Sequence, residues 1–400
     1  MSDELPTRPR RSLSQRGGEI SGTGDSELSA QLTAAIESAD AQDGDDLTHG
    51  FHTYPARMHP ALARELLASS SEPGDLVLDP FCGSGTVLVE ACVAGCRPQG
   101  VDLNPLALRI AEVHCDLRDK ASRARFAANL TSVADASTER VQTRTKPRVP
   151  ISREEQAMYE PHVMLELSGL FEEIERVTND ADRRALAVVF SALLVKFSRK
   201  KSDTSTELVT KRIRKGLVTE FFVRKGRELS LRWEALYENV PRDPFRARLI
   251  QGDARHLRRA LGAVFTANLV LTSPPYGGTY DYAHQHALRN AWFGLDSSAW
   301  EAEEIGARRN LADDARGVER WNYELRGMLR SIRRVLANDG RLILWLGDAD
   351  VSGRRIAADQ QIARLAPEAD FELLASATQA RRDARGGAPR GEHLLLLEPR

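Results

Sequence analysis

The chain has 400 residues, 42% of them hydrophobic, so it holds enough apolar material for a large core in one or two domains. Its 56 Lys and Arg nearly balance its 57 Asp and Glu, so any role on nucleic acid would have to rest on local basic patches. No apolar run at the N-terminus resembles a signal peptide, and the uncharged stretch Ala185–Val195 is too short to cross a bilayer.

The cysteines and histidines give no metal signature. Cysteines 82, 92, 96 and 115 show no paired C-x-x-C spacing, so we expect them to pack in the core of a protein from a reducing cytoplasm. His49, His52 and His59 lie close together, but no cysteine or set of carboxylates accompanies them. We therefore predict no metal site.

The chain opens with a polar region, residues 1–47, rich in Ser, Gly, Asp and Arg and poor in aromatics. This composition predicts a mostly disordered tail, with one short amphipathic helix possible around Leu28, Leu32 and Ile36. An irregular segment over residues 49–60 follows, with two prolines and two aromatics, and a helix is expected over Ala61–Leu67.

The first regular pattern is a βαβ unit. Asp75–Asp79 reads as a buried strand, Thr86–Ala94 as a helix and Gln99–Leu103 as a second strand. Asn104 is the expected N-cap of a further helix that begins at Pro105. Strand, glycine turn, helix and strand in this order predict a parallel sheet.

Residues 117–245 interrupt that rhythm and are expected to be helical. Hydrophobic residues recur at helical spacing over Glu154–Val177, and Ala185–Phe197 is apolar nearly all round. Thr206–Asn239 reads as one or two more helices. We predict an inserted helical subdomain that divides one catalytic domain into residues 48–116 and 246–400.

The alternating pattern then resumes. The expected strands are 248–251, 269–272 and 341–346, the expected helices 283–293 and 319–337, and residues 296–316 read as a charged loop. Residues 371–378 and 392–398 read as a terminal antiparallel pair. The whole pattern predicts an α/β, doubly wound, mostly parallel sheet of the Rossmann-like kind.

Three features fall where strands of such a sheet end, which is where these folds bind ligands. They are the loop Phe81–Gly85, Asp102 and Asp253. Glycines let the backbone approach a ligand, and an acid after the second strand suits ribose hydroxyls. A nicotinamide cofactor is disfavoured because the third glycine of G-x-G-x-x-G would fall at Leu88, so the pattern predicts another nucleoside-containing cofactor.

The segment Thr272–Tyr276 reads Thr-Ser-Pro-Pro-Tyr and follows a buried strand. Two prolines stiffen the loop and cannot continue a central strand, and their neighbouring carbonyls stay free as acceptors. A rigid loop with free acceptors and an aromatic ring suits a planar amine. The aromatics and polar groups of Tyr280–His286 would lie beside it.

Taken together, the two motifs carry a resemblance. Asp79-Pro80-Phe81-Cys82-Gly83-Ser84-Gly85-Thr86, followed by Thr272–Tyr276, is similar to the amino-methyltransferases of DNA, which use S-adenosylmethionine. Tyr54-Pro55-Ala56-Arg57 resembles an additional cofactor motif of that family. The resemblance covers roughly residues 49–116 and 246–348 and implies a seven-stranded methyltransferase sheet.

The resemblance also implies roles for individual residues. Phe81, Gly83 and Gly85 would line the methionine end of the cofactor, Asp102 would hold its ribose and Asp253 its adenine. A backbone carbonyl and the Ser273 side chain would accept hydrogen bonds from the target amine, and the Tyr276 ring would stack on an extruded base. The full expected set is Tyr54, Pro55, Asp79, Phe81, Gly83, Gly85, Thr86, Asp102, Asp253 and Ala254 for the cofactor, and Ser273, Pro274, Pro275 and Tyr276 for catalysis.

Several targets remain open. Ser273 before Pro-Pro-Tyr leans towards the N4 amine of cytosine, whereas Asp or Asn is commoner in N6-adenine enzymes. Some tRNA guanine-N2 methyltransferases carry a similar glycine loop, usually with an N-terminal RNA-binding domain for which residues 1–47 are too short and polar. A catalytically idle nucleic-acid-binding subunit is an alternative of another class. A DNA enzyme of this kind could serve a restriction or other defence partner.

We expect the DNA-binding residues to lie in the helical insertion. Lys196–Arg232 holds twelve Lys and Arg against four Asp and Glu. Beside a base-flipping site such a stretch predicts phosphate contacts, although a solvated basic helix face would look the same. The candidate phosphate-binding residues are Lys200, Lys201, Lys211, Arg212, Lys215, Arg224 and Lys225.

Overall fold

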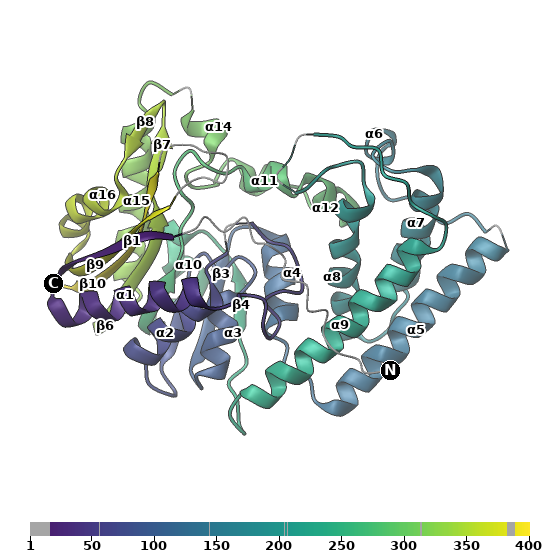
Figure 1. The fold of residues 1–400 in the computed structure, drawn as a ribbon, viewed down its shortest axis with the longest axis horizontal. Helices are drawn as coiled ribbons and strands as arrows, with labels where there is room; N and C mark the ends of the chain where they lie inside the picture. Colours follow the sequence, from purple (N-terminus) through teal and green to yellow (C-terminus); the bar gives the residue numbers. More distant parts are fainter. Residues whose placement is uncertain are drawn as a thin grey trace.

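The structure, a computed structural model, describes residues 17–400 except residues 56, 144, 204, 206, 313 and 382–388. Its centre is an eight-stranded sheet in the order β1-β9-β10-β6-β5-β2-β3-β4 (Figure 1). In chain order these strands are β1 (Gly17–Gly24), β2 (Leu76–Asp79), β3 (Arg97–Asp102), β4 (Arg248–Gln251), β5 (Ala267–Thr272), β6 (Leu336–Gly347), β9 (Phe371–Arg381) and β10 (Arg390–Pro399).

The sheet is mostly parallel, as the sequence predicts. Strands β4, β3, β2, β5 and β6 pair in parallel, and β10 is antiparallel to both β6 and β9. Strands β3 and β4 lie on one side of β2, and strands β5 and β6 lie on its other side. The strand order therefore reverses between β2 and β5. In doubly wound sheets this reversal opens a crevice at the carboxyl ends of the strands. The predicted Rossmann-like methyltransferase fold class is confirmed.

The eighth strand corrects the expected disordered tail. From residue 17 the chain forms β1, which pairs antiparallel with β9 and becomes the edge of the sheet, and α1 (Ser26–Ala41), which Asp25 caps. Leu32 and Ile36 are buried against α2 (Pro60–Ser70). Backbone pairing with β9 stabilises this strand along an otherwise open edge. Its Gly-rich sequence therefore shows no hydrophobic pattern that would predict a strand. Residues 1–16 lie outside the described part.

Helices cover both faces of the sheet. Apolar residues of α1, α2 and α3 (Thr86–Val93) share one core with the strands, and those of α10 (Leu257–Leu261), α15 (Gly317–Arg333) and α16 (Ala358–Leu365) share another. The expected helix over 319–337 is too long at its end, because Leu336 already pairs with Ala267 as the first residue of β6.

The helical region fills residues 120–239 and lies on the right of Figure 1. It comprises α5 (Lys120–Gln142), α6 (Arg153–Gln156), α7 (Pro161–Glu175), α8 (Asp180–Phe197) and α9 (Leu217–Asn239). Pro161 begins α7 and so divides the helix expected over 154–177. Between α8 and α9, residues 198–203, 205 and 207–216 form no helix, so α9 is shorter than the helix expected over 206–239. Residue 206, where that expected helix begins, lies outside the described residues.

This helical region does not form a hydrophobic core of its own. Its hydrophobic cluster includes Ile110 of α4 (Pro105–His114) and Trp292 of α12 (Ala287–Trp292), so the insertion packs directly on the sheet domain. The remaining elements are short: η1 (Ala254–His256), α11 (Tyr282–Gln285), α13 (Ser298–Glu301), α14 (Arg308–Leu311), β7 (Ala349–Val351), β8 (Arg354–Ile356) and η2 (Ala366–Ala369). The helix expected over 283–293 is thus two short helices, α11 and α12.

Candidate active site

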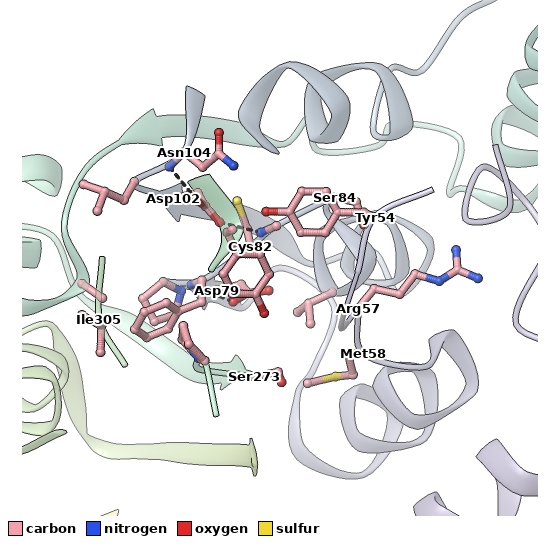
Figure 2. A pocket seen from close by; sticks show the side chains of 18 of the residues that line it. Tyr54, Arg57, Met58, Asp79, Cys82, Ser84, Asp102, Asn104, Ser273 and Ile305 are labelled. Carbon is pink, nitrogen blue, oxygen red and sulfur yellow. Dashed lines mark hydrogen bonds between the residues drawn. The ribbon is translucent and has the colours of Figure 1, made fainter. Parts of the chain in front are cut away.

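A pocket of about 870 Å³, including its open mouth, lies where the strand order reverses (Figure 2). Its wall is built from the loops that follow β2, β3, β4 and β5. Eight of the predicted cofactor residues line it: Tyr54, Asp79, Phe81, Gly83, Thr86, Asp102, Asp253 and Ala254. Ser273 and Pro275 of the predicted catalytic loop line the same pocket. Residues far apart in sequence therefore meet in one cavity.

The loop after β2 needs both of its glycines. Gly83 has φ +49° and Gly85 φ +87°, a region that other residues seldom adopt. A Cβ at Gly83 would stand 3.1 Å from the Tyr54 ring, and one at Gly85 would stand 3.1 Å from Ala111. Gly85 does not line the pocket; it is the residue from which α3 begins. Its role is to turn the chain into the helix.

Asp102, at the end of β3, ties two loops together. One carboxylate oxygen accepts the Gly83 N–H at 2.8 Å and the other accepts the Asn104 N–H at 2.8 Å, the bond drawn in Figure 2. Burial raises the pKa of the Asp102 carboxyl to about 6. Because each carboxylate oxygen has a second lone pair, Asp102 can still accept from hydroxyls in the pocket.

Asp79, at the end of β2, joins the glycine loop to the catalytic loop. Its Oδ1 accepts the Thr272 hydroxyl at 2.6 Å and the Phe81 N–H at 3.1 Å. Thr272 is the last residue of β5 and directly precedes Ser273. The two loops are therefore held in a fixed relation by one buried carboxylate.

Burial raises the pKa of Asp79 from 3.8 to about 7, because the ionised form loses its hydration. Between these values the folded chain retains a proton that the unfolded chain releases, so this group lowers folding stability as the pH rises through that window. Asp79→Asn keeps an oxygen acceptor and carries no charge. We expect its free energy of unfolding, relative to wild type, to increase from pH 5 to pH 8 in urea titrations. An equal difference at both pH values would contradict this.

Asp253, at the end of β4, is already engaged. Arg255 donates to both of its carboxylate oxygens, the shortest contact being 2.6 Å, and the Arg255 N–H donates to it as well. Asp253 still lines the pocket beside Gly252 and Ala254. Its carboxylate is therefore held in a fixed orientation towards a ligand.

The segment before α2 closes one side. The Tyr54 ring stacks with the rings of Tyr282 and His286, whose centroids are 6.3 and 5.2 Å away. Arg57 and Met58 line the pocket next to it, whereas Pro55 does not. Ala56, part of the quoted motif, lies outside the described residues. Of the expected motif, Tyr54 and Arg57 reach the pocket.

The residues of the predicted catalytic loop lie in two different surroundings. Ser273 and Pro275 face the pocket, Pro274 is buried, and Tyr276 is half-buried away from the cavity. The Tyr276 ring lies over Gly347 of β6, where a Cβ would stand 2.7 Å from it. Just beyond, Gly278 has φ +71° and lies against the Asp350 carbonyl. The loop is thus packed tightly from behind.

Sequence reasoning missed part of the wall. Trp300, Glu304 and Ile305 line the pocket, although residues 296–316 read as a charged loop. All three are buried, and no periodic pattern in so short a segment could have shown it. Asn104 was expected only as a helix cap; its Oδ1 does cap α4, and the residue also lines the pocket.

Two predicted phosphate ligands are corrected. The Lys225 ammonium is buried, donates to the Phe51 carbonyl and Glu228 and lies over the Phe51 ring. The Lys211 ammonium donates to the Val195 and Lys196 carbonyls at the C-terminus of α8, where a cation is favourable, and to the Lys200 carbonyl just beyond it. Both ammonium groups therefore make their hydrogen bonds within the fold.

The other predicted phosphate ligands lie nearer the surface. Arg212, Lys215 and Arg224 are exposed, and Lys201 is exposed but paired with Glu207 at 2.7 Å. Lys200 is half-buried, and burial lowers the pKa of its ammonium. The surface that remains for a polyanion is therefore smaller than the sequence suggests.

Three further observations concern the cysteines, metal sites and membrane-spanning helices of the described residues. The four cysteines are buried free thiols. Within those ranges no three His, Cys, Asp or Glu side chains come together as a metal site. No helix in that part of the chain has the length and apolarity needed to span a membrane.

The pocket fits S-adenosylmethionine. Asp102 offers acceptors to a pair of hydroxyls, and the N-terminus of α3 presents backbone N–H groups to a carboxylate. Phe81 supplies apolar surface between them, and Asp253 offers an acceptor to an amine. S-Adenosylmethionine consists of a nucleoside, a sulfonium centre and an amino acid in a line, and these three parts need such surroundings in this order.

The sheet order, with antiparallel β10 inserted next to β6, is that of the Rossmann-like methyltransferase fold. The family described as DNA methylase matches residues 26–113, which supports that family over this part of the chain. The Type II methyltransferase M.MjaII of Methanocaldococcus jannaschii is 40% identical over 65 residues, 16% of this chain and 12% of that protein. The chain thus covers about an eighth of that relative.

The chain is also similar to two proteins named as RNA methyltransferases. The tRNA (guanine(10)-N2)-dimethyltransferase of Methanothermobacter thermautotrophicus is 46% identical over 52 residues, 13% of this chain and 16% of that protein. The rRNA methyltransferase aviRa from Streptomyces viridochromogenes is 16% identical, with a TM-score of 0.36 over 89% of this chain and 94% of that one.

Proposed function

We propose that this protein is an S-adenosylmethionine-dependent DNA methyltransferase that modifies an exocyclic amine, with N4 of cytosine as its target. One observation carries the proposal: the glycine loop after β2 and the Ser-Pro-Pro-Tyr loop after β5 line one pocket and are joined by the Asp79–Thr272 hydrogen bond. The DNA methylase match over residues 26–113 supports the choice of substrate class.

In this mechanism the bound cofactor supplies an electrophilic sulfonium methyl group. The chain positions and polarises the target. Ser273 and a backbone carbonyl of the loop accept hydrogen bonds from the amine, which directs the nitrogen lone pair at the methyl carbon. Asp102 and the glycine loop would hold the cofactor, which would supply the methyl group, and the methylated amine would release one proton to solvent. Tyr276 stacks on the extruded base, which offsets the few kcal/mol that unstacking costs.

The alternative functions share this fold and differ in the methylated product that they would form. Ser273 favours cytosine over adenine as target. The tRNA relative supports guanine N2 as a second candidate. An idle binding subunit would keep the fold without the chemistry. A DNA substrate would place the protein with DNA in the cytoplasm, where a restriction or defence nuclease would be its partner.

The test is direct. The full chain is incubated with labelled S-adenosylmethionine and, separately, unmodified genomic DNA and total tRNA, followed by nucleoside mass spectrometry. We expect N4-methylcytosine in DNA. N6-methyladenine would overturn the choice of base, N2-methylguanosine in tRNA the choice of nucleic acid, and binding without any methylated product would show the idle subunit.

A second prediction concerns the DNA contact. Arg212, Lys215 and Arg224 are the exposed cations of the predicted set without a carboxylate partner in the described structure. Reversing all three to Glu is expected to weaken DNA binding by about tenfold or more at low salt and to flatten its salt dependence. Fluorescence anisotropy over a salt series measures both.

The control reverses Lys120 and Arg242, two exposed cations outside the predicted phosphate-binding set. We expect their reversal to change DNA affinity by less than about threefold, because exposed charges that do not contact the DNA are screened by salt. Equal losses in both variants would mean that Arg212, Lys215 and Arg224 make no local contact with DNA.

A further inference from the structure

One wall of the pocket comes from the connection between α12 and α15, residues 293–316. This connection contributes Trp300, Glu304 and Ile305. In Figure 2 Ile305 lies on the side of Asp102 and Asn104, across the pocket from Arg57 and Met58. The wall therefore borders the end of the pocket formed by β3 and β4, where a nucleoside would lie.

The wall is fastened at several points. Arg255, which holds Asp253, also donates to the Glu303 carbonyl at 3.0 Å and to its carboxylate at 2.7 Å. Glu304 accepts the Tyr282 N–H at 2.7 Å and pairs with Arg309 at 2.8 Å. Arg255 thus links Glu303 of the wall to Asp253, which lines the pocket, and we call this link the clasp. Trp300 lies within one turn of that clasp, its carbonyl accepting the Glu303 N–H.

Trp300 has a donor that the protein does not use. The side chain is 4% exposed, and its indole Nε1 finds no acceptor among the described residues. Asn104, 3% exposed and at the same end of the pocket, likewise has an unpaired side-chain N–H donor, Nδ2. A buried N–H without an acceptor costs about 1–3 kcal/mol. Two such donors at one end of a ligand pocket point to a ligand that supplies acceptors.

The other tryptophans do not line this pocket. In the core, the Trp233 indole donates to the Val113 carbonyl at 2.8 Å and the Trp292 indole to the Tyr159 hydroxyl at 3.1 Å. The buried Trp321 indole, like that of Trp300, finds no acceptor among the described residues. What distinguishes Trp300 is that its unused donor belongs to a residue of the pocket wall, next to the unused donor of Asn104.

We propose that Trp300 is a binding residue for the adenosine part of the cofactor, packing its ring on the nucleoside and donating its indole N–H to an acceptor there. Adenine offers ring nitrogens as acceptors, and ribose offers hydroxyl oxygens. The clasp of Arg255 to Glu303 holds Trp300 in place. This inference rests on the proposed function for the identity of the cofactor.

The experiment measures binding and needs no turnover. S-Adenosylhomocysteine and 5′-methylthioadenosine, which lacks the amino acid, are titrated into wild type, Trp300→Phe and Trp233→Phe by calorimetry. Trp300→Phe is expected to weaken both ligands by about tenfold, the worth of one hydrogen bond, and Trp233→Phe to change neither by more than about twofold. Equal affinity of wild type and Trp300→Phe overturns the inference, as does a loss confined to S-adenosylhomocysteine.

A second variant avoids the core. Glu303 is largely exposed, so Glu303→Ala should leave the fold intact while removing half of the clasp. Stopped-flow tryptophan fluorescence is expected to show about threefold faster release of S-adenosylhomocysteine; an unchanged rate overturns the role of the clasp. The failures are distinguishable: wild type that binds both nucleosides but methylates nothing refutes the proposed function alone.

Discussion

Replacing Asp102 with alanine is expected to weaken S-adenosylhomocysteine binding about a hundredfold or more. The carboxylate accepts the N–H groups of Gly83 and Asn104, so its loss releases the loops after β2 and β3 together. It would also remove the acceptor that a ribose needs. Hydrogen bonds to a charged group contribute about 1.5–3 kcal/mol each, so two or three of them account for this loss. Calorimetric titration measures it.

Asp102→Asn is the informative control. It keeps one oxygen acceptor and places an amide where the second oxygen stood, so one of the two loops stays anchored. We expect an intermediate affinity and a melting temperature close to that of wild type. If Asp102→Ala bound S-adenosylhomocysteine within about threefold of wild type, the acid would be a structural cap and the cofactor would lie elsewhere.

The sheet and most of its pocket could be predicted because their signals are local. A strand, two glycines at positive φ and a helix occupy a single run of the sequence, Asp75–Ala94. Asp102 and Asp253 each follow a short apolar strand. The topology then brings these strand ends together, since the carboxyl ends of parallel strands meet at one edge. Eight of the ten expected cofactor residues line the pocket for that reason.

What escaped prediction depends on contacts between distant segments. Strand β1 is held by backbone bonds to β9, more than 350 residues later, and its composition is that of a loop. Lys225 belongs to a basic run, yet α9 turns it inwards onto Phe51. Trp300 lies in a charged segment that is held at the pocket by contacts with distant residues, among them that of Arg255 with Glu303. The residue pattern within each of these segments does not indicate which distant segment it contacts.

Replacing Tyr276 with alanine is expected to lower the rate of methyl transfer by roughly 10- to 100-fold while leaving S-adenosylhomocysteine affinity within about twofold of wild type. The ring does not line the cofactor pocket, so cofactor binding should not depend on it. Stacking on an extruded base contributes about 1–3 kcal/mol, which the variant would lose. Single-turnover kinetics and calorimetry separate the two effects, and 2-aminopurine fluorescence at the target position reports extrusion.

Two further variants give this prediction a matched pair. Tyr276→Phe keeps the ring and is expected to retain most of the rate. Gly347→Ala leaves the tyrosine unchanged but places a methyl group 2.7 Å from its ring, so the ring must move. We expect Gly347→Ala to reproduce much of the loss seen with Tyr276→Ala, again at unchanged cofactor affinity. If both substitutions left the rate intact, the ring would be packing for β6, and the base would have to be held by Ser273 and the proline carbonyls alone.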